Sequence, residues 1–502
     1  MVDPPPERSA AAATDEGPTS GLRPTVPLPV VGEGDQPGGH VRLFGTHMFF
    51  RLWLAQVVSA LGDWLGFLAI TILAARVGGG SGASAVGLVM TARILPGFFL
   101  APVAGVMIDR WDRKRVMVAC DVGRAAVLAV LPFVDTVLGL VVASLVLEIG
   151  TLLWSPAKEA SVPTLVPTER LTSANSLALA AAYGTFPVAA ALFALLAKVA
   201  EWLGGIEAFD QLKVNQESLA FYVDVVTFLI SAVMISTLRL PKQRRVTAKL
   251  PGRRIDWTGT FHELAEGWHF IVLSPVVRAV NVGLATGLIG GGMVVPLGSV
   301  FSIVVLGAGP AGYGVFITAL GLGVALGVLG LSLGQKRLPK ARVFTLPLFA
   351  AWGSLICAAI MTTLAPAALL FAVLGVCAGA VYVLGFTLLH ENVEDELRGR
   401  IFAALYTVVR LCLLVAFAVG PFLSELLDRL SRNLFDDRRV ELVGVEVFLP
   451  GVRLTLWLAG LIILAAGGLA ASSLRAGLLR STARTGAPDM PDGSPQPAGD
   501  LT

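Results

Sequence analysis

Charge is scarce in this sequence: Asp, Glu, Lys and Arg make up only 15% of its 502 residues, well below the share in ordinary soluble domains. The formal net charge of +3 is too small to indicate a nucleic-acid-binding surface. The four cysteines lie inside apolar runs and lack metal-ligand spacing, so we expect neither a metal site nor disulfides. No Gly-x-x-x-x-Gly-Lys-Ser/Thr loop occurs, so phosphoryl transfer has no support. We therefore expect no enzyme and no cofactor.

Apolar residues are abundant instead. Hydrophobic residues make up 55% of the chain, and the mean hydropathy is +0.76. The apolar runs repeatedly reach the ~20 residues that a helix needs to cross a ~30 Å hydrocarbon core. The sequence therefore predicts an all-α membrane protein with twelve transmembrane helices. The predicted spans are 49–76, 84–108, 116–134, 138–156, 172–199, 219–239, 276–305, 312–333, 343–363, 367–389, 401–427 and 452–474.

Composition divides the chain into two halves, a linker and two tails. The first residues are rich in Pro, Gly, Ser, Ala and acids and contain no apolar signal-peptide core. Apolar residues recur at helical spacing between 261 and 268, which predicts an interfacial amphipathic helix. We expect a disordered cytoplasmic tail over 1–41, a six-helix half over 42–240, a cytoplasmic linker over 241–275, a second six-helix half over 276–474 and a disordered cytoplasmic tail over 475–502.

The loops predict an orientation. Basic residues gather after spans two, six, eight and ten, whereas the opposite loops carry almost none. The loop over 428–453 is an exception, because its arginines are interleaved with acids. Loops rich in Lys and Arg stay in the cytoplasm. We therefore expect a multi-pass protein of the plasma membrane, acting as a monomer in the lipid bilayer, with both termini in the cytoplasm.

A weak internal repeat relates the two halves. A shift of 227 residues places Arg115-Val116 on Arg342-Val343 and superposes the loops after spans four and ten, with sparse identities. Two six-helix halves in the same orientation follow, which is the parallel-repeat arrangement of transporters with a substrate cavity between the halves.

A cluster of charged residues separates spans two and three. Asp109 ends span two, where the carbonyl end of a helix disfavours an acid, so its carboxylate needs a partner. Gly105, one turn earlier, leaves room for the close approach of another helix.

This stretch resembles the signature loop of the major facilitator superfamily, Gly-x-x-x-Asp-Arg/Lys-x-Gly-Arg/Lys-Arg/Lys, between helices two and three. Asp112 replaces the second glycine, as in similar variants of the drug and siderophore exporter branch. The resemblance implies that Asp109 latches the outward-facing state against the start of helix eleven, near 398–400. The matching positions, which we assign to a cytoplasmic latch, are Gly105, Asp109, Arg110, Arg113 and Lys114.

Asp121 and Arg124 are assigned to the same latch. They lie three residues apart on span three near its cytoplasmic end, where they could pair on one helix face. We expect this pair to brace the loop that contains Asp109.

A second likeness covers roughly residues 50–240. The segments 59–65, 154–167 and 183–190 resemble the membrane halves that are fused to thymidylate kinase in actinobacterial proteins. This resemblance implies an exporter-like membrane module and leaves its cargo open.

Three charged residues lie inside the predicted spans. A carboxylate at the bilayer centre costs about 2.5–3.5 kcal/mol on insertion scales, so it usually faces a wet cavity or a partner. Asp63 in span one, Arg93 in span two and Glu148 in span four lie at similar depth, so they could form a cluster. Since helices one and four line the central cavity in the superfamily, Asp63 and Glu148 resemble proton carriers and Arg93 their counter-charge. A static ion network that fixes helix packing is the alternative.

Two further residues are cavity candidates. Tyr183 begins Tyr-Gly-Thr-Phe-Pro on span five, which loosely resembles the antiporter signature, although a proline-kinked packing helix explains it equally well. Arg410 lies about ten residues into span eleven, where it would meet cargo or extend to the interface.

The sequence thus predicts a secondary transporter that exports a small hydrophobic or amphipathic molecule in exchange for protons. Two alternatives stay open: a transporter of lipid-like cargo, and a non-transporting membrane scaffold for a cytosolic enzyme such as a nucleotide kinase.

Overall fold

The computed structural model describes most of the chain. The described residues are 44–108, 111–203, 217–240, 274–334, 343–393, 395–435, 438–442 and 445–485. The expected tail over 1–41, most of the linker over 241–275 with its amphipathic helix, and Asp109 and Arg110 lie outside them.

The described residues of the N-terminal half form seven α-helices. The helices α6 and α7 form one membrane-length unit that is interrupted at Thr185, two residues before Pro187. Proline inside a helix removes a hydrogen bond and kinks the backbone, which accounts for the break. The helices are α2 (His47–Val77), α3 (Gly82–Ile108), α4 (Arg113–Val130), α5 (Val137–Leu165), α6 (Leu171–Gly184), α7 (Phe186–Leu203) and α8 (Ser218–Ser236).

The C-terminal half repeats this plan and adds a hairpin. Strands β1 (Arg439–Leu442) and β2 (Val445–Phe448) pair antiparallel in the loop between the last two helices. The sequence did not predict this hairpin. The helices are α10 (Pro275–Gly292), α11 (Val294–Val304), α12 (Gly309–Gly334), α14 (Thr345–Ile360), α15 (Leu364–Asn392), α16 (Asp395–Leu434) and α17 (Gly451–Thr485).

The helical membrane fold is confirmed. Among the described residues, eleven helical segments are long and apolar enough to cross a membrane, and α14 is a shorter apolar helix at the position of the predicted span 343–363. Some helices are longer than predicted: α5 ends at Leu165, α16 covers Asp395–Leu434, and α17 continues to Thr485, into the segment expected to be disordered.

The helix boundaries follow the internal repeat closely. The helices α3 and α12 begin at Gly82 and Gly309, and α5 and α15 begin at Val137 and Leu364, so both offsets are 227 residues. The shift read from sparse sequence identities therefore relates structurally equivalent helices.

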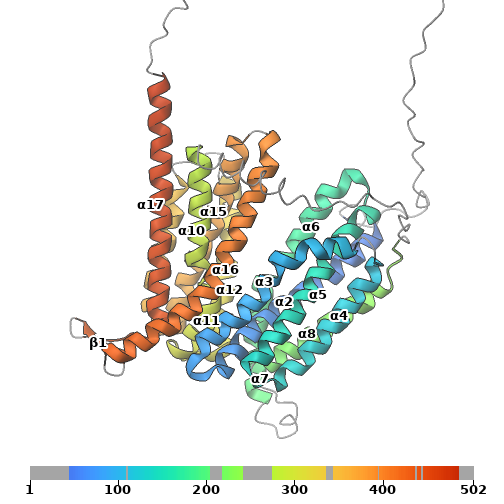
Figure 1. Cartoon of the computed structure of the whole chain (residues 1–502), viewed down its shortest axis with the longest axis horizontal. Helices are drawn as coiled ribbons and strands as arrows, with labels where there is room; N and C mark the ends of the chain where they lie inside the picture. Colours follow the sequence, from blue (N-terminus) through green and yellow to red (C-terminus); the bar gives the residue numbers. More distant parts are fainter. Residues whose placement is uncertain are drawn as a thin grey trace, which may run out of the picture.

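The two ends of the helix bundle are packed differently. We call the end where α2 begins and α8 ends the basic end, and the opposite end, which carries β1 and β2, the hairpin end. Near the hairpin end a single hydrophobic core joins both halves; it includes Phe193 of α7, Tyr313 and Phe316 of α12, and Phe417 of α16. At the basic end each half has a core of its own. Figure 1 accordingly shows the halves in contact below and apart above.

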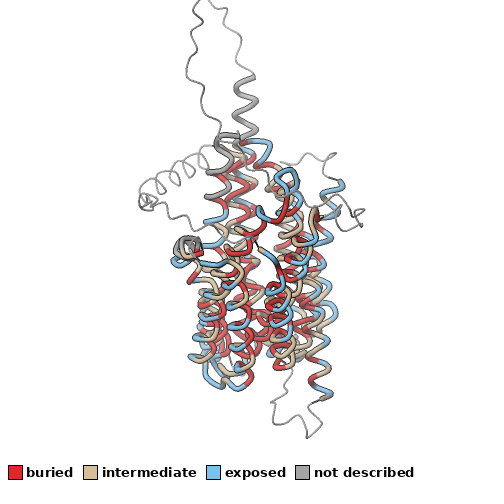
Figure 2. The backbone as a smooth tube through the Cα atoms, turned by 90° about the vertical axis from the view of Figure 1, so that its right-hand side faces the viewer, coloured by how far each residue is buried: buried red, intermediate tan, exposed pale blue. Residues whose placement is uncertain are grey.

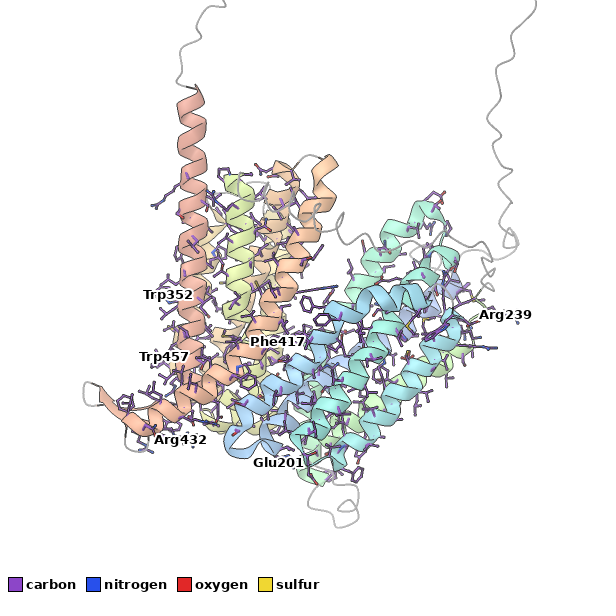
Figure 3. All side chains as sticks on the ribbon, in the orientation of Figure 1. Glu201, Arg239, Trp352, Phe417, Arg432 and Trp457 are labelled. Carbon is purple, nitrogen blue, oxygen red and sulfur yellow. The ribbon has the colours of Figure 1, made fainter. Side chains whose placement is uncertain are left out.

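Helix pairs α7–α12 and α3–α16 make most of the contacts between the halves, and α11 adds contacts to α2 and α3. The ring of Phe67 on α2 lies 6.4 Å from that of Phe417, which Figure 3 places where the halves meet. Figure 2 shows buried and exposed stretches alternating along the helices, as expected when one face of each helix packs inward. Among the described residues, the halves therefore share a hydrophobic core near the hairpin end and have separate cores at the basic end.

Candidate functional site: a buried charge network in the N-terminal half

A buried arginine organises the charges of the N-terminal half. The Nη1 atom of Arg124 on α4 donates to both carboxylate oxygens of Asp63 on α2 at 3.3 Å, and its Nη2 atom donates to Asp121 at 2.5 Å. Asp121 also accepts a hydrogen bond from Ser231 of α8 at 2.8 Å. The guanidinium carbon lies 4.1 Å from the centre of the Phe228 ring, a cation–π contact. Three helices thus surround one cation with two carboxylates.

The two carboxylates differ in their access to solvent. The side chain of Asp63 is 33% exposed, whereas that of Asp121 is fully buried. Asp63 is therefore the carboxylate of the network that solvent can reach, and Asp121 is the carboxylate that is enclosed by protein.

A second pair of charges lies beside the first. Glu148 on α5 is partly buried and interacts electrostatically with Arg93 and with Asp63. The guanidinium carbon of Arg93 lies 5.7 Å from the centre of the Phe67 ring. The structure thus brings Asp63, Arg93 and Glu148 into one neighbourhood, but the direct partner of Asp63 is Arg124 rather than Arg93.

The positions of Asp121 and Arg124 correct an expectation. The sequence placed this pair at the cytoplasmic end, bracing the loop that contains Asp109. In the structure the two side chains are buried beside Asp63, and Asp121 bonds to α8. The spacing of three residues predicted their pairing, but the depth of span three was misjudged, because α4 starts at Arg113 and places Asp121 more than two turns inside the helix.

The described residues of the predicted latch bond within the N-terminal half. Asp112, which stands where the family pattern has glycine, is the N-cap of α4, and its carboxylate accepts from the Arg115 amide at 2.9 Å. Arg113 donates to the Ala160 carbonyl at 2.7 Å, and Lys114 donates to the Leu238 carbonyl at 2.9 Å. Both carbonyls lie near helix ends, where cations are favoured. Gly105 lies in the last turn of α3.

Three tyrosines, one from the N-terminal half and two from the C-terminal half, have exposed side chains. Tyr183 on α6 is 67% exposed, and Tyr382 on α15 and Tyr406 on α16 are each 52% exposed. Tyr382 interacts electrostatically with both of the others. These interactions link a residue of the N-terminal half to two residues of the C-terminal half. Phe386 stacks 4.4 Å from Tyr382, and Arg410 is exposed one turn from Tyr406.

Sequence reasoning missed Tyr382 and Tyr406. A signal was present, since Tyr382 lies one helical turn from the aromatic Phe386, and Tyr406 lies one turn from the candidate Arg410. In spans this rich in apolar residues, however, that spacing does not distinguish a cavity wall from a lipid-facing surface.

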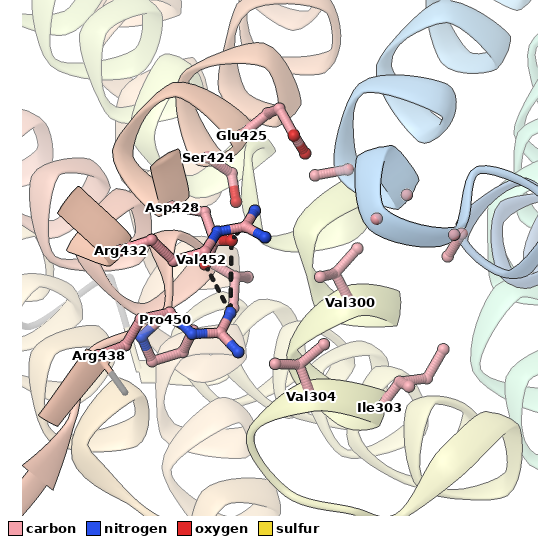
Figure 4. A pocket seen from close by; sticks show the side chains of 15 residues that line it. Val300, Ile303, Val304, Ser424, Glu425, Asp428, Arg432, Arg438, Pro450 and Val452 are labelled. Atoms are coloured by element: carbon pink, nitrogen blue, oxygen red, sulfur yellow. Dashed lines mark hydrogen bonds and ion pairs between the residues drawn. The ribbon is translucent and has the colours of Figure 1, made fainter. Parts of the chain in front are cut away.

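A cavity of about 320 Å³ lies at the hairpin end, between the halves. Glycines 79, 80 and 82 line one side, and Glu425, Asp428 and Arg432 of α16 line the other (Figure 4). Asp428 accepts from Arg438 at 3.1 Å and from the Gly451 amide at 2.9 Å, so its carboxylate fixes the hairpin to α17. Among the described residues, no group of three or more His, Cys, Asp or Glu could hold a metal ion.

Two helical halves related by a repeat, one of which buries a charge network, are the arrangement expected of a multi-pass membrane transporter. The chain belongs to the Major Facilitator Superfamily, whose family model matches residues 52–417.

Relatives extend over much of the chain at low identity. The uncharacterized MFS-type transporter YfiS of Bacillus subtilis is 26% identical over 390 residues, which cover 74% of this chain and 86% of the relative. Macrolide efflux protein A of Streptococcus pyogenes is 29% identical over 201 residues, 39% of this chain and 45% of that protein.

Solved structures share the fold. A bacterial homolog of the human lysosomal transporter Spinster, solved in an inward-facing and unoccupied conformation, aligns with a TM-score of 0.65 over 86% of this chain and 98% of that chain. The sequence identity is 14%, so this likeness concerns the fold alone.

Proposed function

We propose that this protein exports a small hydrophobic or amphipathic molecule in exchange for protons, by alternating access between its two halves. Membership of the superfamily supports transport, and the similarity to macrolide efflux protein A supports the direction and the cargo class. The coupling to protons rests on the geometry of the charge network.

The observation that carries the proposal is the sharing of Arg124 between Asp63 and Asp121. When Asp63 takes up a proton, Arg124 keeps the charge of Asp121 and is not left as an unpaired buried cation, which would cost several kcal/mol. Protonation of Asp63 would therefore not leave a cation without a carboxylate partner inside the protein. Because Asp63 is also the exposed member, it is the residue at which cargo and proton would compete.

The tyrosines supply a surface for such a cargo. Aromatic rings bind apolar bodies and cations on their faces while the phenol hydroxyls form hydrogen bonds. Tyr183 belongs to one half, and Tyr382 and Tyr406 belong to the other. A molecule held among them would contact both halves and would be affected when they rock.

The packing of the two ends supports alternating access. A shared core closes the hairpin end, and separate cores leave the basic end divided. If the basic loops are cytoplasmic, as their charge predicts, the conformation described here is open toward the cytoplasm. Export would then require the separate cores to approach and the shared core to part.

The test uses Asp63→Asn, with the exposed loop variant Asp135→Asn as a matched control. Purified protein is reconstituted in proteoliposomes, and pH-gradient-driven accumulation of two probes, erythromycin and ethidium, is measured. For at least one probe we expect Asp63→Asn to lose at least 10-fold in gradient-driven transport and Asp135→Asn to match the wild type. Gradient-driven transport of that probe by Asp63→Asn at the wild-type rate would refute coupling through this residue. Transport of neither probe by the wild type would refute the cargo class.

A further inference from the structure

A carboxyl group that the proposed function does not use lies behind Asp63. Asp224 on α8 is 1% exposed, and its Oδ1 atom accepts a hydrogen bond from the Thr227 hydroxyl of the same helix at 3.1 Å. Among the described residues, no hydrogen bond reaches its Oδ2 atom and no ion pair forms with it. Asp224 is thus a buried acid whose direct partner is one neutral hydroxyl.

Two glycines of α2 leave the space that this carboxyl occupies, which we call the seat of Asp224. A Cβ atom at Gly62 would overlap Oδ1 of Asp224, and one at Gly66 would overlap Oδ2, so only glycine leaves room at either position. Leu128 of α4 closes the seat beside Gly66. These two glycines flank Asp63 in the chain, so the seat lies at the depth of the charge network.

Acids outnumber cations around this seat. The charged groups that act on Asp224 are Asp63 from α2, Arg124 from α4 and Arg93 from α3. Helix α7 also packs on α8, and its Lys198 and Glu201 are exposed and pair with each other at 3.9 Å. With Asp121 and Glu148 included, four carboxyls face two arginines, and full ionisation would leave an excess of two negative charges inside the half.

An excess of buried negative charge is costly unless a proton or a cation neutralises it. Arg124 bonds Asp63 and Asp121, whereas neither Glu148 nor Asp224 forms an ion pair among the described residues, and Asp224 is the more deeply buried of these two. We propose that Asp224 is a second proton-binding site, seated on Gly62 and Gly66, which holds a proton in the conformation described here. The inference deepens the proposed function, since it raises the number of proton sites in the coupling half from one to two.

The test reads the proton directly and needs no cargo. Infrared spectra of the purified protein in detergent at neutral pH, in H₂O and in D₂O, report the C=O stretch of protonated carboxyl groups. We expect the wild type to show this band, Asp224→Asn to lose the part due to one carboxyl, and the control Asp135→Asn to keep it unchanged. An unchanged band in Asp224→Asn overturns the proposal, as does a band in the wild type that sodium ions remove, because the ligand is then a cation.

A second variant covers the case in which Asp224→Asn does not fold. Thr227→Val keeps the acid and removes its hydrogen-bonding hydroxyl, so the band of Asp224 should shift in frequency; an unshifted band in this variant also overturns the proposal. Because the spectra are independent of transport, they separate this inference from the proposed function. A protein that carries the band at Asp224 but transports neither probe would contradict the proposed function only.

Discussion

Among the described residues, each half buries one arginine, and the two are neutralised in opposite ways. Arg124 in the N-terminal half is held by the carboxylates of Asp63 and Asp121. Arg453, at the start of α17, donates instead to main-chain carbonyls of Ala359, Phe448, Ile360 and Met361. Among the described residues no carboxylate pairs with Arg453. The first cation sits among groups that can take up protons, and the second sits among groups that cannot.

Positions that the repeat relates show the same difference between the halves: they are charged in the first and uncharged in the second. Arg93 and Glu148 attract each other across α3 and α5, and their counterparts at a shift of 227 residues are Leu320 on α12 and Gly375 on α15. A Cβ at Gly375 would overlap the carbonyl oxygen of Leu320. A helix pair that holds charges in one half is therefore packed backbone to backbone in the other.

This contrast indicates that the two halves have different roles. Close glycine-mediated packing makes a helix pair rigid, because it has little space for rearrangement. A network of shared charges can change its protonation at modest cost. We infer that the N-terminal half changes its protonation and that the C-terminal half is packed rigidly. The next three predictions test this difference between the halves.

The largest effect is expected at the two buried arginines. Arg124→Gln leaves two carboxylates without their cation, and we expect the free energy of unfolding to fall by about 3–5 kcal/mol. Arg453→Gln leaves neutral carbonyls without donors and should cost about 1–3 kcal/mol. Unfolding in detergent, followed by circular dichroism, measures both.

The dependence on pH sharpens this prediction. In Arg124→Gln, Asp63 and Asp121 lose the cation that both contact, and protonation would remove their uncompensated charge, so the stability deficit relative to wild type should be smaller at pH 5 than at pH 8. Arg453→Gln should show the same deficit relative to wild type at pH 5 and pH 8. Equal pH dependence in the two variants would break the comparison between the halves.

A smaller effect is expected from a methyl group in the glycine packing of the C-terminal half. A Cβ at Gly327 would overlap the carbonyl oxygen of Val376, whereas one at Gly330 on the same helix would meet open space. We expect Gly327→Ala to lower the free energy of unfolding by about 1–3 kcal/mol through overpacking, with Gly330→Ala as the neutral control. If the two variants unfold alike, α12 and α15 are not rigidly packed.

The smallest effect is expected at the cap of α4. Asp112→Ala removes the acceptor for the Arg115 amide and should cost about 1 kcal/mol, whereas Asp112→Asn keeps an oxygen in place and should cost less. Transport by both variants should stay near the wild-type rate, because the cap is not part of the charge network. A transport defect in Asp112→Ala without loss of stability would show that this loop does more than start the helix.

Much of the fold could be predicted because membrane helices have a strong local signal. Lengths near 20 apolar residues and basic loops on alternate sides predict spans and halves without any tertiary information. The hairpin over 439–448 escaped prediction, since short strands among charged residues have no such signal. The extension of α17 to Thr485 escaped because polar helix and polar tail have similar compositions.

The charge network could be predicted only in part. The depth of Asp63, Arg93 and Glu148 along their spans follows from counting residues, and their proximity was expected on that basis. The bond from Arg124 to Asp63 and the seat of Asp224 on Gly62 and Gly66 depend on how α4 and α8 are rotated against α2. In spans that are apolar all round, no amphipathic pattern fixes that rotation.

The sequence by itself determined the number and approximate limits of the membrane helices, the twofold repeat and the presence of charge inside the membrane, because each depends on local hydropathy. Tertiary structure alone decided which charges are partners, that Asp121 and Arg124 lie beside Asp63, and that the halves are joined at the hairpin end. These features depend on the facing of helices far apart in the chain, and pairing there is selected by close packing and by the cost of leaving a buried charge alone.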